Sequence, residues 1–221
     1  MKELKIKNCG KIYLEDNIKD GIGKRNSKIF LNDVSIEFAK KSKQLFDMTG
    51  ELIYYYREKQ LHSVFVPIID KLGDAIITEI PTIRNKDNYG WIDYWVKYAS
   101  TIFLIELKHS YYNLQNNELR DSSLKEWQIA INQINSIKND DIFKVNNENI
   151  IKIALNVITI YHNNNFIPKL DIEEIKDKIL QKTEADFITI WIPPIYMSEL
   201  VVEWKDSIEK YPAVVIIAKV I

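Results

Sequence analysis

The chain has 221 residues, of which 46% are hydrophobic and 28% charged, with 6 glycines and 6 prolines. This balance predicts one globular domain and excludes fibrous and intrinsically disordered chains. The 30 basic and 31 acidic side chains give a net charge of −1, which excludes a protein that gathers polyanions through a positive surface as a whole. The single cysteine, Cys9, excludes an internal disulfide and a cysteine-based zinc site.

The first 33 residues are the most basic part of the chain, and we expect them to be an extension that packs on a single domain of residues 34–221. The expected structure of this extension is a solvated hairpin. The sequence starts without the apolar core of a signal peptide, and no apolar run approaches the roughly 18 residues that a membrane span needs. These features predict a cytoplasmic protein that does not contact a membrane.

Two helices are predicted next, over residues 34–46 and 49–72. In the second, apolar residues recur every three to four positions, which is typical of an amphipathic helix with one buried stripe. Pro67 is expected to kink or divide this helix. Glu58 projects along the same stripe, in nearly the direction of Phe65. A carboxylate that is directed at the core needs a partner there.

Short segments rich in Ile, Thr, Tyr and Trp follow, and they predict three antiparallel strands in a meander over residues 75–83, 91–98 and 101–108. A helix over residues 124–138 comes next, and then a nearly continuous apolar strand over residues 150–161, typical of the centre of a sheet. The remaining elements are a helix over residues 172–181 and strands over residues 187–192 and 213–220. This order predicts one α/β domain around a mixed sheet.

Three charged residues interrupt the apolar strands of the meander. Asp93 lies in the second strand, and Glu106 and Lys108 lie two residues apart in the third, so these two point to the same face. A hairpin that turns at residues 99 and 100 pairs residues whose numbers sum to about 199, which sets Asp93 opposite Glu106. Two carboxylates roughly 5 Å apart repel each other unless a cation lies between them.

A divalent metal ion is the cation that this pattern predicts. Oxygen ligands without a His or Cys cluster favour Mg²⁺ or Mn²⁺ over Zn²⁺. Such an ion polarises a phosphodiester, and a nearby ammonium group orients the attacking water and offsets developing negative charge, a role for which Lys108 has the reach. The non-catalytic alternative is a salt-bridged patch at a sheet edge. Such a patch explains why Glu106 lies beside Lys108 more readily than it explains why Asp93 faces them.

Asp93, a gap of twelve residues, and then Glu106-Leu107-Lys108 at the end of an apolar strand resemble the core signature of the PD-(D/E)xK nucleases, the restriction-endonuclease-like superfamily. The order of elements over residues 51–161 also resembles the αβββαβ core of that superfamily, here followed by C-terminal strands and a helix. Ile92 stands where the signature has proline. The resemblance implies a restriction-endonuclease-like mixed β-sheet flanked by helices.

The activity that the resemblance implies is that of a Mg²⁺-dependent deoxyribonuclease, and specifically an endonuclease, in which Mn²⁺ can substitute. Asp93 and Glu106 would bind the metal ion together with the backbone carbonyl of Leu107, and Lys108 would assist the attacking water. The substrate would be DNA, and cutting both strands of a duplex suggests a homodimer with two active sites.

Further residues match positions that some members of the superfamily use. Glu58, ahead of Glu51, is the best match to a glutamate on the first core helix, and it would complete the acidic site. Glu79 resembles an acidic position on the first strand and is a further metal ligand by that resemblance. A glutamine on the helix after the meander is common in several subgroups, for which Gln133 and Gln128 both qualify.

Three residues beyond the signature are candidates for substrate contact. Tyr111 and Tyr112 follow the third strand in a polar loop, where aromatic rings are available to stack on bases. His109 could touch a phosphate, but it follows Lys108 directly, and adjacent strand residues face opposite sides, which favours an indirect role.

Two other classes of function compete with the nuclease. One is a catalytically inactive nuclease-like fold that serves as a nucleic-acid or protein binding module. The other is a small-molecule enzyme on an unrelated sheet, which predicts an enclosed apolar pocket away from Asp93. No nucleotide-binding or nucleophile-elbow motif supports this last class.

Overall fold

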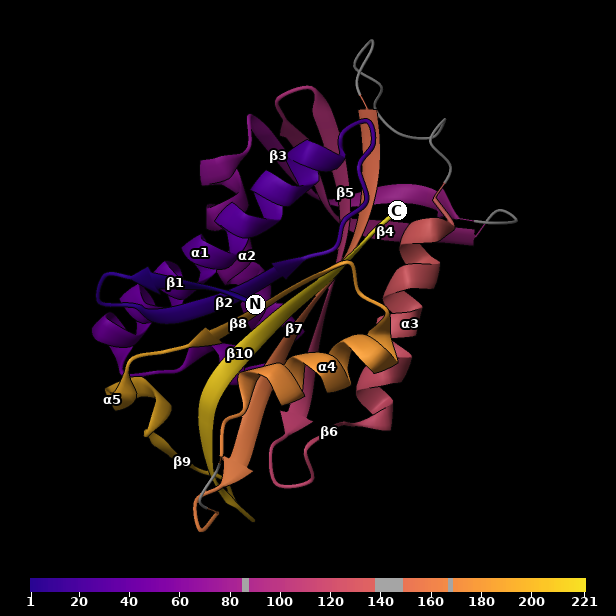
Figure 1. The fold of residues 1–221 in the computed structure, drawn as a ribbon. Coiled ribbons are helices and arrows are strands. Elements are labelled where there is room, and N and C mark those ends of the chain that lie inside the picture. Colours follow the sequence, from indigo (N-terminus) through magenta and orange to yellow (C-terminus); the bar gives the residue numbers. More distant parts are fainter. Residues whose placement is uncertain (85–87, 138–148, 167–168) are drawn as a thin grey trace.

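The computed structural model describes the whole chain except residues 85–87, 138–148 and 167–168. It is a mixed α/β fold in which the described strands form one sheet of order β1-β2-β8-β10-β7-β5-β4-β3, with β6 attached to β5 and β9 to β10 (Figure 1). The strands are β1 (Lys2–Ile6), β2 (Gly10–Asp16), β3 (Ala75–Arg84), β4 (Asn88–Tyr98), β5 (Thr101–Asn113), β6 (Glu118–Leu119), β7 (Asn149–Asn163), β8 (Phe187–Ile192), β9 (Val201–Glu203) and β10 (Ile208–Val220).

Helices cover both faces of this sheet, as Figure 1 shows. The helical elements are α1 (Lys24–Thr49), the 3₁₀ turn η1 (Ile53–Tyr55), α2 (Glu58–Leu72), α3 (Asp121–Asn135), α4 (Ile172–Thr183) and α5 (Ile195–Ser198). One buried cluster joins α1 and α2 to the sheet through residues such as Phe38, Phe65 and Phe103. A second cluster joins α3 and α4 to the opposite face through Trp127 and Ile179. The predicted α/β class is therefore confirmed.

The N-terminal segment forms the predicted hairpin, but this hairpin is an integral part of the sheet. β1 pairs with β2, and β2 continues the sheet by pairing with β8. The first long helix starts at Lys24, ten residues before the predicted start, and so it runs across position 33. Its early start follows from the buried residues Phe30 and Leu31, which extend the apolar stripe toward the N-terminus.

The second predicted helix is interrupted, although not at Pro67. α1 ends at Thr49 and is capped by Gly50, which has a left-handed φ of 75°, and α2 begins only at Glu58. Between them, η1 buries Tyr54 and Tyr55 and leaves the chain extended at Tyr56. Tertiary burial of these aromatic rings outweighs the helical pattern of the sequence, whereas Pro67 is accommodated inside α2.

The predicted meander is confirmed, and its predicted register is confirmed as far as Tyr94↔Ile105, whereas the expected pair of Asp93 with Glu106 is not among the Cα pairs of these strands. β3, β4 and β5 are consecutive antiparallel neighbours, and β4 pairs with β5 from Tyr98↔Thr101 to Tyr94↔Ile105. β7 lies parallel to β5 and antiparallel to β10, and most of its residues are buried, as expected of a central strand. α3 begins three residues before the predicted helix, whose last residue, 138, lies outside the described residues.

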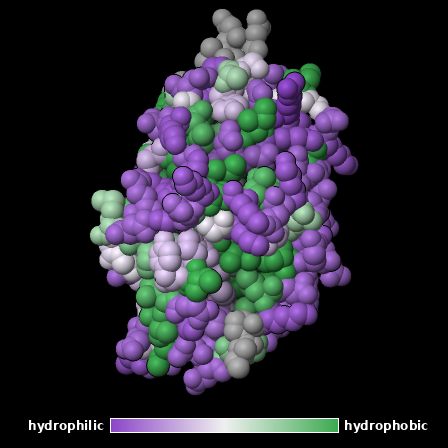
Figure 2. Space-filling view, turned by 60° about the vertical axis from the view of Figure 1, so that its left-hand side comes forward, coloured by the Kyte–Doolittle hydropathy of each residue, from purple (hydrophilic) through white to green (hydrophobic). Residues whose placement is uncertain are grey.

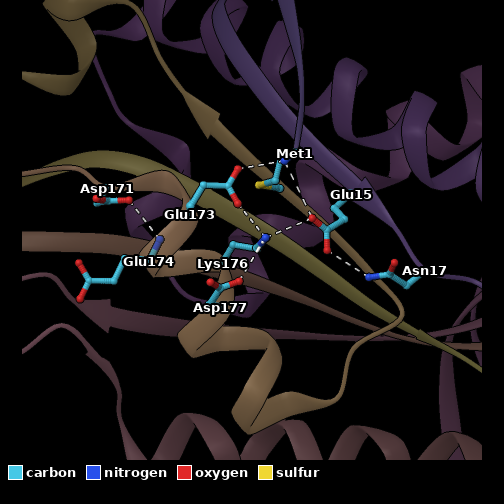
Figure 3. A network of polar contacts seen from close by, with 8 residues as sticks. All are labelled: Met1, Glu15, Asn17, Asp171, Glu173, Glu174, Lys176 and Asp177. Carbon is cyan, nitrogen blue, oxygen red and sulfur yellow. Dashed lines mark hydrogen bonds and ion pairs between the residues drawn. The ribbon is translucent and has the colours of Figure 1, made fainter.

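A network of charged groups fastens α4 to the N-terminal hairpin (Figure 3). The Lys176 Nζ lies 3.3 Å from a Glu15 carboxylate oxygen, 2.7 Å from one of Glu173 and 3.1 Å from one of Asp177. The Met1 amino group donates to Glu173 at 2.9 Å. These ion pairs lie near the surface, where each contributes little to stability, but the three pairs of Lys176 share one cation and so restrict one another.

Replacement of Lys176 by methionine is expected to lower the free energy of unfolding by about 1 kcal/mol or less, because the network is solvent-screened. Urea denaturation at low salt measures this change, and high salt should shrink the difference between parent and variant. Lys182→Met, at an exposed position on the same helix, is the matched control. An effect of Lys176→Met that is equal to the control would show that the network contributes nothing.

The face shown in Figure 2 is largely hydrophilic, and apolar side chains gather in its lower half. Exposed apolar residues of the C-terminal region include Ile195, Val201 and Ile208. Within the described part of the chain, no helix combines the length and the hydropathy that crossing a bilayer requires.

Candidate active site

The site predicted from Asp93 lies where β4 separates from β5. The last Cα pair between these strands is Tyr94↔Ile105. One residue further, the Asp93 Oδ2 accepts a hydrogen bond from the Leu107 backbone N–H at 2.7 Å, in place of a strand partner. Asp93 therefore satisfies a backbone donor of β5 and is held beside the Glu106-Leu107-Lys108 segment.

β4 also turns over at Asp93. Ile92 and Trp95 both belong to the core cluster beneath α3, whereas Tyr94 belongs to the cluster beneath α1 and α2. A regular strand would set residues 92 and 95 on opposite faces, so the face changes at position 93. Because of this change, β4 no longer pairs with β5 beside Glu106. The charged residues meet at this unpaired end of the two strands.

The neighbouring strand β3 is distorted at the same level. Its pairs with β4 include Thr78↔Tyr94 and Ile80↔Ile92, which brackets Glu79 opposite Asp93. Glu79 has φ 52, in the left-handed region that costs a non-glycine residue roughly 1–2 kcal/mol. Its side chain is exposed, and no described contact joins it to Lys108. The structure thus sets Glu79 next to Asp93 in register, at a strained backbone position.

Glu106 and Lys108 point to the same face of β5, as predicted, and both are buried, with 3% and 8% of their surface exposed. The Lys108 Nζ lies 3.2 Å from Glu106 Oε1 and donates to the Leu107 carbonyl at 3.1 Å. It also lies 3.5 Å from Glu58 Oε1. One ammonium group therefore bridges a carboxylate of β5 and a carboxylate of α2.

The electrostatic surroundings keep Lys108 protonated. Burial lowers the pKa of Lys108, but the carboxylates of Glu106, Glu58 and Asp93, with the hydrogen bond to Glu106, act in the opposite direction and raise the pKa above its usual value. Lys108 is thus a fixed cation among three acids. It is suited to bind an anion or to donate a hydrogen bond, and not to act as a base.

Glu58, and not Glu51, is the helix acid that reaches this cluster. Glu58 opens the first turn of α2, and its side chain, 38% exposed, meets Lys108. The Glu51 carboxylate instead accepts hydrogen bonds from the Tyr55 hydroxyl at 2.7 Å and the Tyr56 hydroxyl at 3.2 Å. Glu51 therefore fixes the η1 turn.

Asn156 of β7 is a polar neighbour of the cluster that sequence reasoning missed. Its Cα partner in the parallel pair is Lys108, and its Nδ2 donates to the Ser110 Oγ at 3.0 Å. The Asn156 Oδ1 is fully buried and has no hydrogen-bond partner among the described residues. The available signal was a lone amide within the apolar run of residues 150–161. A buried acceptor without a partner is costly, so this oxygen needs a donor or a cation.

The two candidate glutamines of α3 differ in position. Gln133 is half-buried and follows the buried Ala130 by three residues, which sets it about 60° from Ala130 around the helix. Gln128 follows the buried Trp127, is exposed, and donates to Asn132 Oδ1 at 3.2 Å. α3 covers the face of β5 that carries Lys108, so Gln133 is the better placed of the two.

The predicted substrate-contact residues do not share one environment. Tyr112 is fully buried beneath α3, and its hydroxyl donates to Asn117 Oδ1 at 2.6 Å, so its burial does not fit substrate contact. Tyr111 points to the other face, where it lines a pocket. The His109 ring meets Thr159 Oγ1 at 3.0 Å and packs edge-on against Tyr111. Burial lowers the pKa of His109 to about 4, so this ring is neutral at physiological pH.

The ligand atoms at this site are of the type that a hard cation prefers, but their present arrangement does not form a metal site. Asp93, Glu106, the Leu107 carbonyl and the Asn156 amide are all oxygen donors, which Mg²⁺ prefers. Among the described residues, however, no three His, Cys, Asp or Glu side chains are arranged to hold a metal ion. Lys108 itself contacts two of the prospective ligands, Glu106 and the Leu107 carbonyl. Metal binding here requires that the ammonium group move aside.

Comparison with known proteins adds no relative to this description: neither the protein-family models nor the curated proteins that were searched match the sequence.

Proposed function

We propose that this chain is a Mg²⁺-dependent deoxyribonuclease, with a fold like that of the PD-(D/E)xK enzymes, that hydrolyses phosphodiester bonds in DNA. The observation that carries the proposal is the convergence of Glu58, Asp93, Glu106 and Lys108, from three separate elements, at the point where β4 leaves β5. A salt bridge between Glu106 and Lys108 alone would not require Asp93 to face them.

Asp93 and Glu106, with the Leu107 carbonyl, would hold the metal ion. Bound there, Mg²⁺ would polarise the phosphodiester and lower the pKa of a water ligand. Lys108 would hold its proton on Nζ, orient the attacking water by hydrogen bonding and offset charge on the phosphate. Glu58 would position Lys108 through their ion pair. The buried Asn156 Oδ1 is a further oxygen within this region.

Asp93→Asn is expected to reduce DNA cleavage at least about a hundredfold, because the charge that binds the cation is lost while the amide oxygen can still accept from Leu107. Cleavage of duplex and single-stranded DNA with Mg²⁺ or Mn²⁺ measures this loss, and Mn²⁺ calorimetry measures binding. Asp70→Asn, at an exposed carboxylate on α2, is the matched control. Equal cleavage by folded Asp93→Asn and parent would refute the proposal.

A binding module without catalysis is the second candidate, and one observation favours it. The Lys108 ammonium already bridges Glu58 and Glu106, and so offsets part of their negative charge without a metal ion. This candidate predicts nucleic-acid binding that survives chelation and no cleavage of any DNA substrate. The homodimer stays a prediction of the nuclease proposal, and sedimentation of the pure protein as a monomer would count against it.

A further inference from the structure

A pocket of about 510 Å³ lies beside the first turn of α2, within the range of roughly 300–1,000 Å³ that is typical of ligand pockets. Its walls come from η1, α2, β5, β7, the segment before α3, the β9–β10 turn and β10. Six aromatic residues line it: Tyr55, Tyr56, Tyr111, Tyr161, Trp204 and Tyr211. Aromatic rings around a hollow provide apolar surface on which a planar ligand can stack.

The aromatic rings support one another, and two of them are accessible. Tyr55 stacks on Tyr56 at 4.3 Å and on Tyr211 at 5.5 Å between ring centroids. The Trp204 ring meets Tyr55 edge-on at 5.5 Å, and its Nε1 donates to the Tyr211 hydroxyl at 2.9 Å. Trp204 remains 46% exposed and Tyr56 is half-buried. The pocket therefore offers rings that are already held in place, which reduces the entropy cost of stacking a planar ligand.

Two guanidinium groups stand at the same pocket. Arg120 lies over the Tyr161 ring at 5.0 Å and donates to its hydroxyl. Arg57 is exposed and has no ion-pair partner among the described residues. Burial and the Glu209 carboxylate raise the pKa of Tyr111, whereas the charges of Arg57 and Arg120 lower it, which agrees with two cations and one acid lying near that ring. The Glu209 carboxylate accepts hydrogen bonds from the Ser207 and Tyr211 hydroxyls, whereas Arg57 is available to an anion. Cations beside aromatic rings suit a ligand with a flat ring and a negative charge.

The pocket adjoins the candidate active site through α2. Arg57 directly precedes Glu58, whose carboxylate contacts Lys108, and Gln60 of the same helical turn also lines the pocket. Tyr111 lies three residues beyond Lys108 on β5, roughly 10 Å along the strand, and its side chain points to the opposite face. The pocket and the cluster are therefore joined at the first turn of α2, where a nucleic-acid strand with its scissile phosphate at Lys108 would pass Glu58 and Arg57 before its neighbouring nucleotide reaches the pocket.

We propose that this pocket binds an unstacked nucleotide of the substrate strand, with its base against Trp204 and Tyr56 and its phosphate at Arg57 and Arg120. The proposal rests on the nuclease function and narrows its substrate to DNA with an unpaired base near the cleavage position. Every base has a ring face, so recognition of this kind tolerates any sequence.

The test is binding of a labelled short oligo(dT) by fluorescence anisotropy in EDTA, where no cleavage can occur. Trp204→Leu is expected to weaken binding about 5- to 100-fold, the range for loss of one stacked base. Tyr196→Leu, at a 52% exposed aromatic residue on α5, is the matched control and should leave binding unchanged. The same oligonucleotide with abasic residues should bind more weakly to the parent and should not distinguish parent from Trp204→Leu.

Three results would overturn the proposal: equal binding by parent and Trp204→Leu, equal binding of intact and abasic strands, or no binding of oligo(dT) to the parent. Displacement of the strand by dTMP near the strand's own Kd would identify a free nucleotide as the ligand and would also overturn it. Binding is measured without metal, so its outcomes can be interpreted even if the Asp93→Asn cleavage test contradicts the nuclease proposal. Likewise, the cleavage test can be interpreted if the binding experiment contradicts the pocket proposal.

Discussion

Lys108→Met is expected to lower the free energy of unfolding by about 3–5 kcal/mol at neutral pH, the usual cost of removing one partner of a buried ion pair. Methionine retains the length and the apolar stem of lysine, so the lost quantity is the ammonium charge. Its removal leaves the Glu106 carboxylate, 3% exposed, without the cation at 3.2 Å and with Glu58 and Asp93 nearby. Urea denaturation followed by circular dichroism measures the change.

A second substitution distinguishes charge from packing in this experiment. Lys108→Met/Glu106→Gln removes both charges of the pair. This double variant is expected to recover much of the lost stability, because the buried carboxylate is removed together with the ammonium group. Lys71→Met is the matched control, since Lys71 pairs with Glu37 at 2.6 Å but is 64% exposed, and it should cost under about 1 kcal/mol. A cost of Lys108→Met no larger than this control would contradict a buried charge cluster.

Acid is expected to destabilise the protein through His109. Burial lowers the pKa of His109 from 6.5 to about 4 in the folded protein. A base with a depressed pKa stabilises the fold fully above the pKa of the unfolded chain, and this stabilisation is lost as the pH falls from 6.5 toward 4. The shift corresponds to a loss of about 3 kcal/mol across that window.

His109→Gln tests this assignment, because glutamine can still hydrogen-bond to Thr159 but does not titrate. The free energy of unfolding of the variant should fall less than that of the parent between pH 7 and pH 4. An NMR titration of the His109 ring protons gives the folded-state pKa directly. Parallel stability curves for parent and variant would assign the acid sensitivity to other groups.

The meander and its register could be predicted because they depend on local residues. The two-residue turn at Ala99, where φ is 49, joins β4 to β5, and this short connection determines which residues face each other. The approach of Asp93 to the Glu106-Leu107-Lys108 segment then follows from counting along two strands. Glu58, the partner of Lys108 on α2, could also be predicted as a site residue, because it interrupts an apolar stripe.

Other features depend on contacts between distant segments, which periodicity does not encode. The polar sequence around Tyr112 predicts a loop, but in the structure Tyr112 belongs to β5 and is buried beneath α3. The break before Glu58 arises because Tyr55 packs on Tyr211, more than 150 positions later in the sequence. The aromatic pocket combines η1 with the β9–β10 turn, so no single stretch of sequence carries its pattern.

The position of β10 in the sheet has a consequence for the order of folding. β10 lies between β8 and β7, so among the described strands it alone connects the half of the sheet that holds β1, β2 and β8 to the half that holds β7, β5, β4 and β3. The N-terminal hairpin therefore joins the rest only after a strand from the far end of the sequence has docked. Closing such long loops is entropically costly before any contact forms, so we expect slow folding in which the meander with α3 and β7 assembles first and waits for β10.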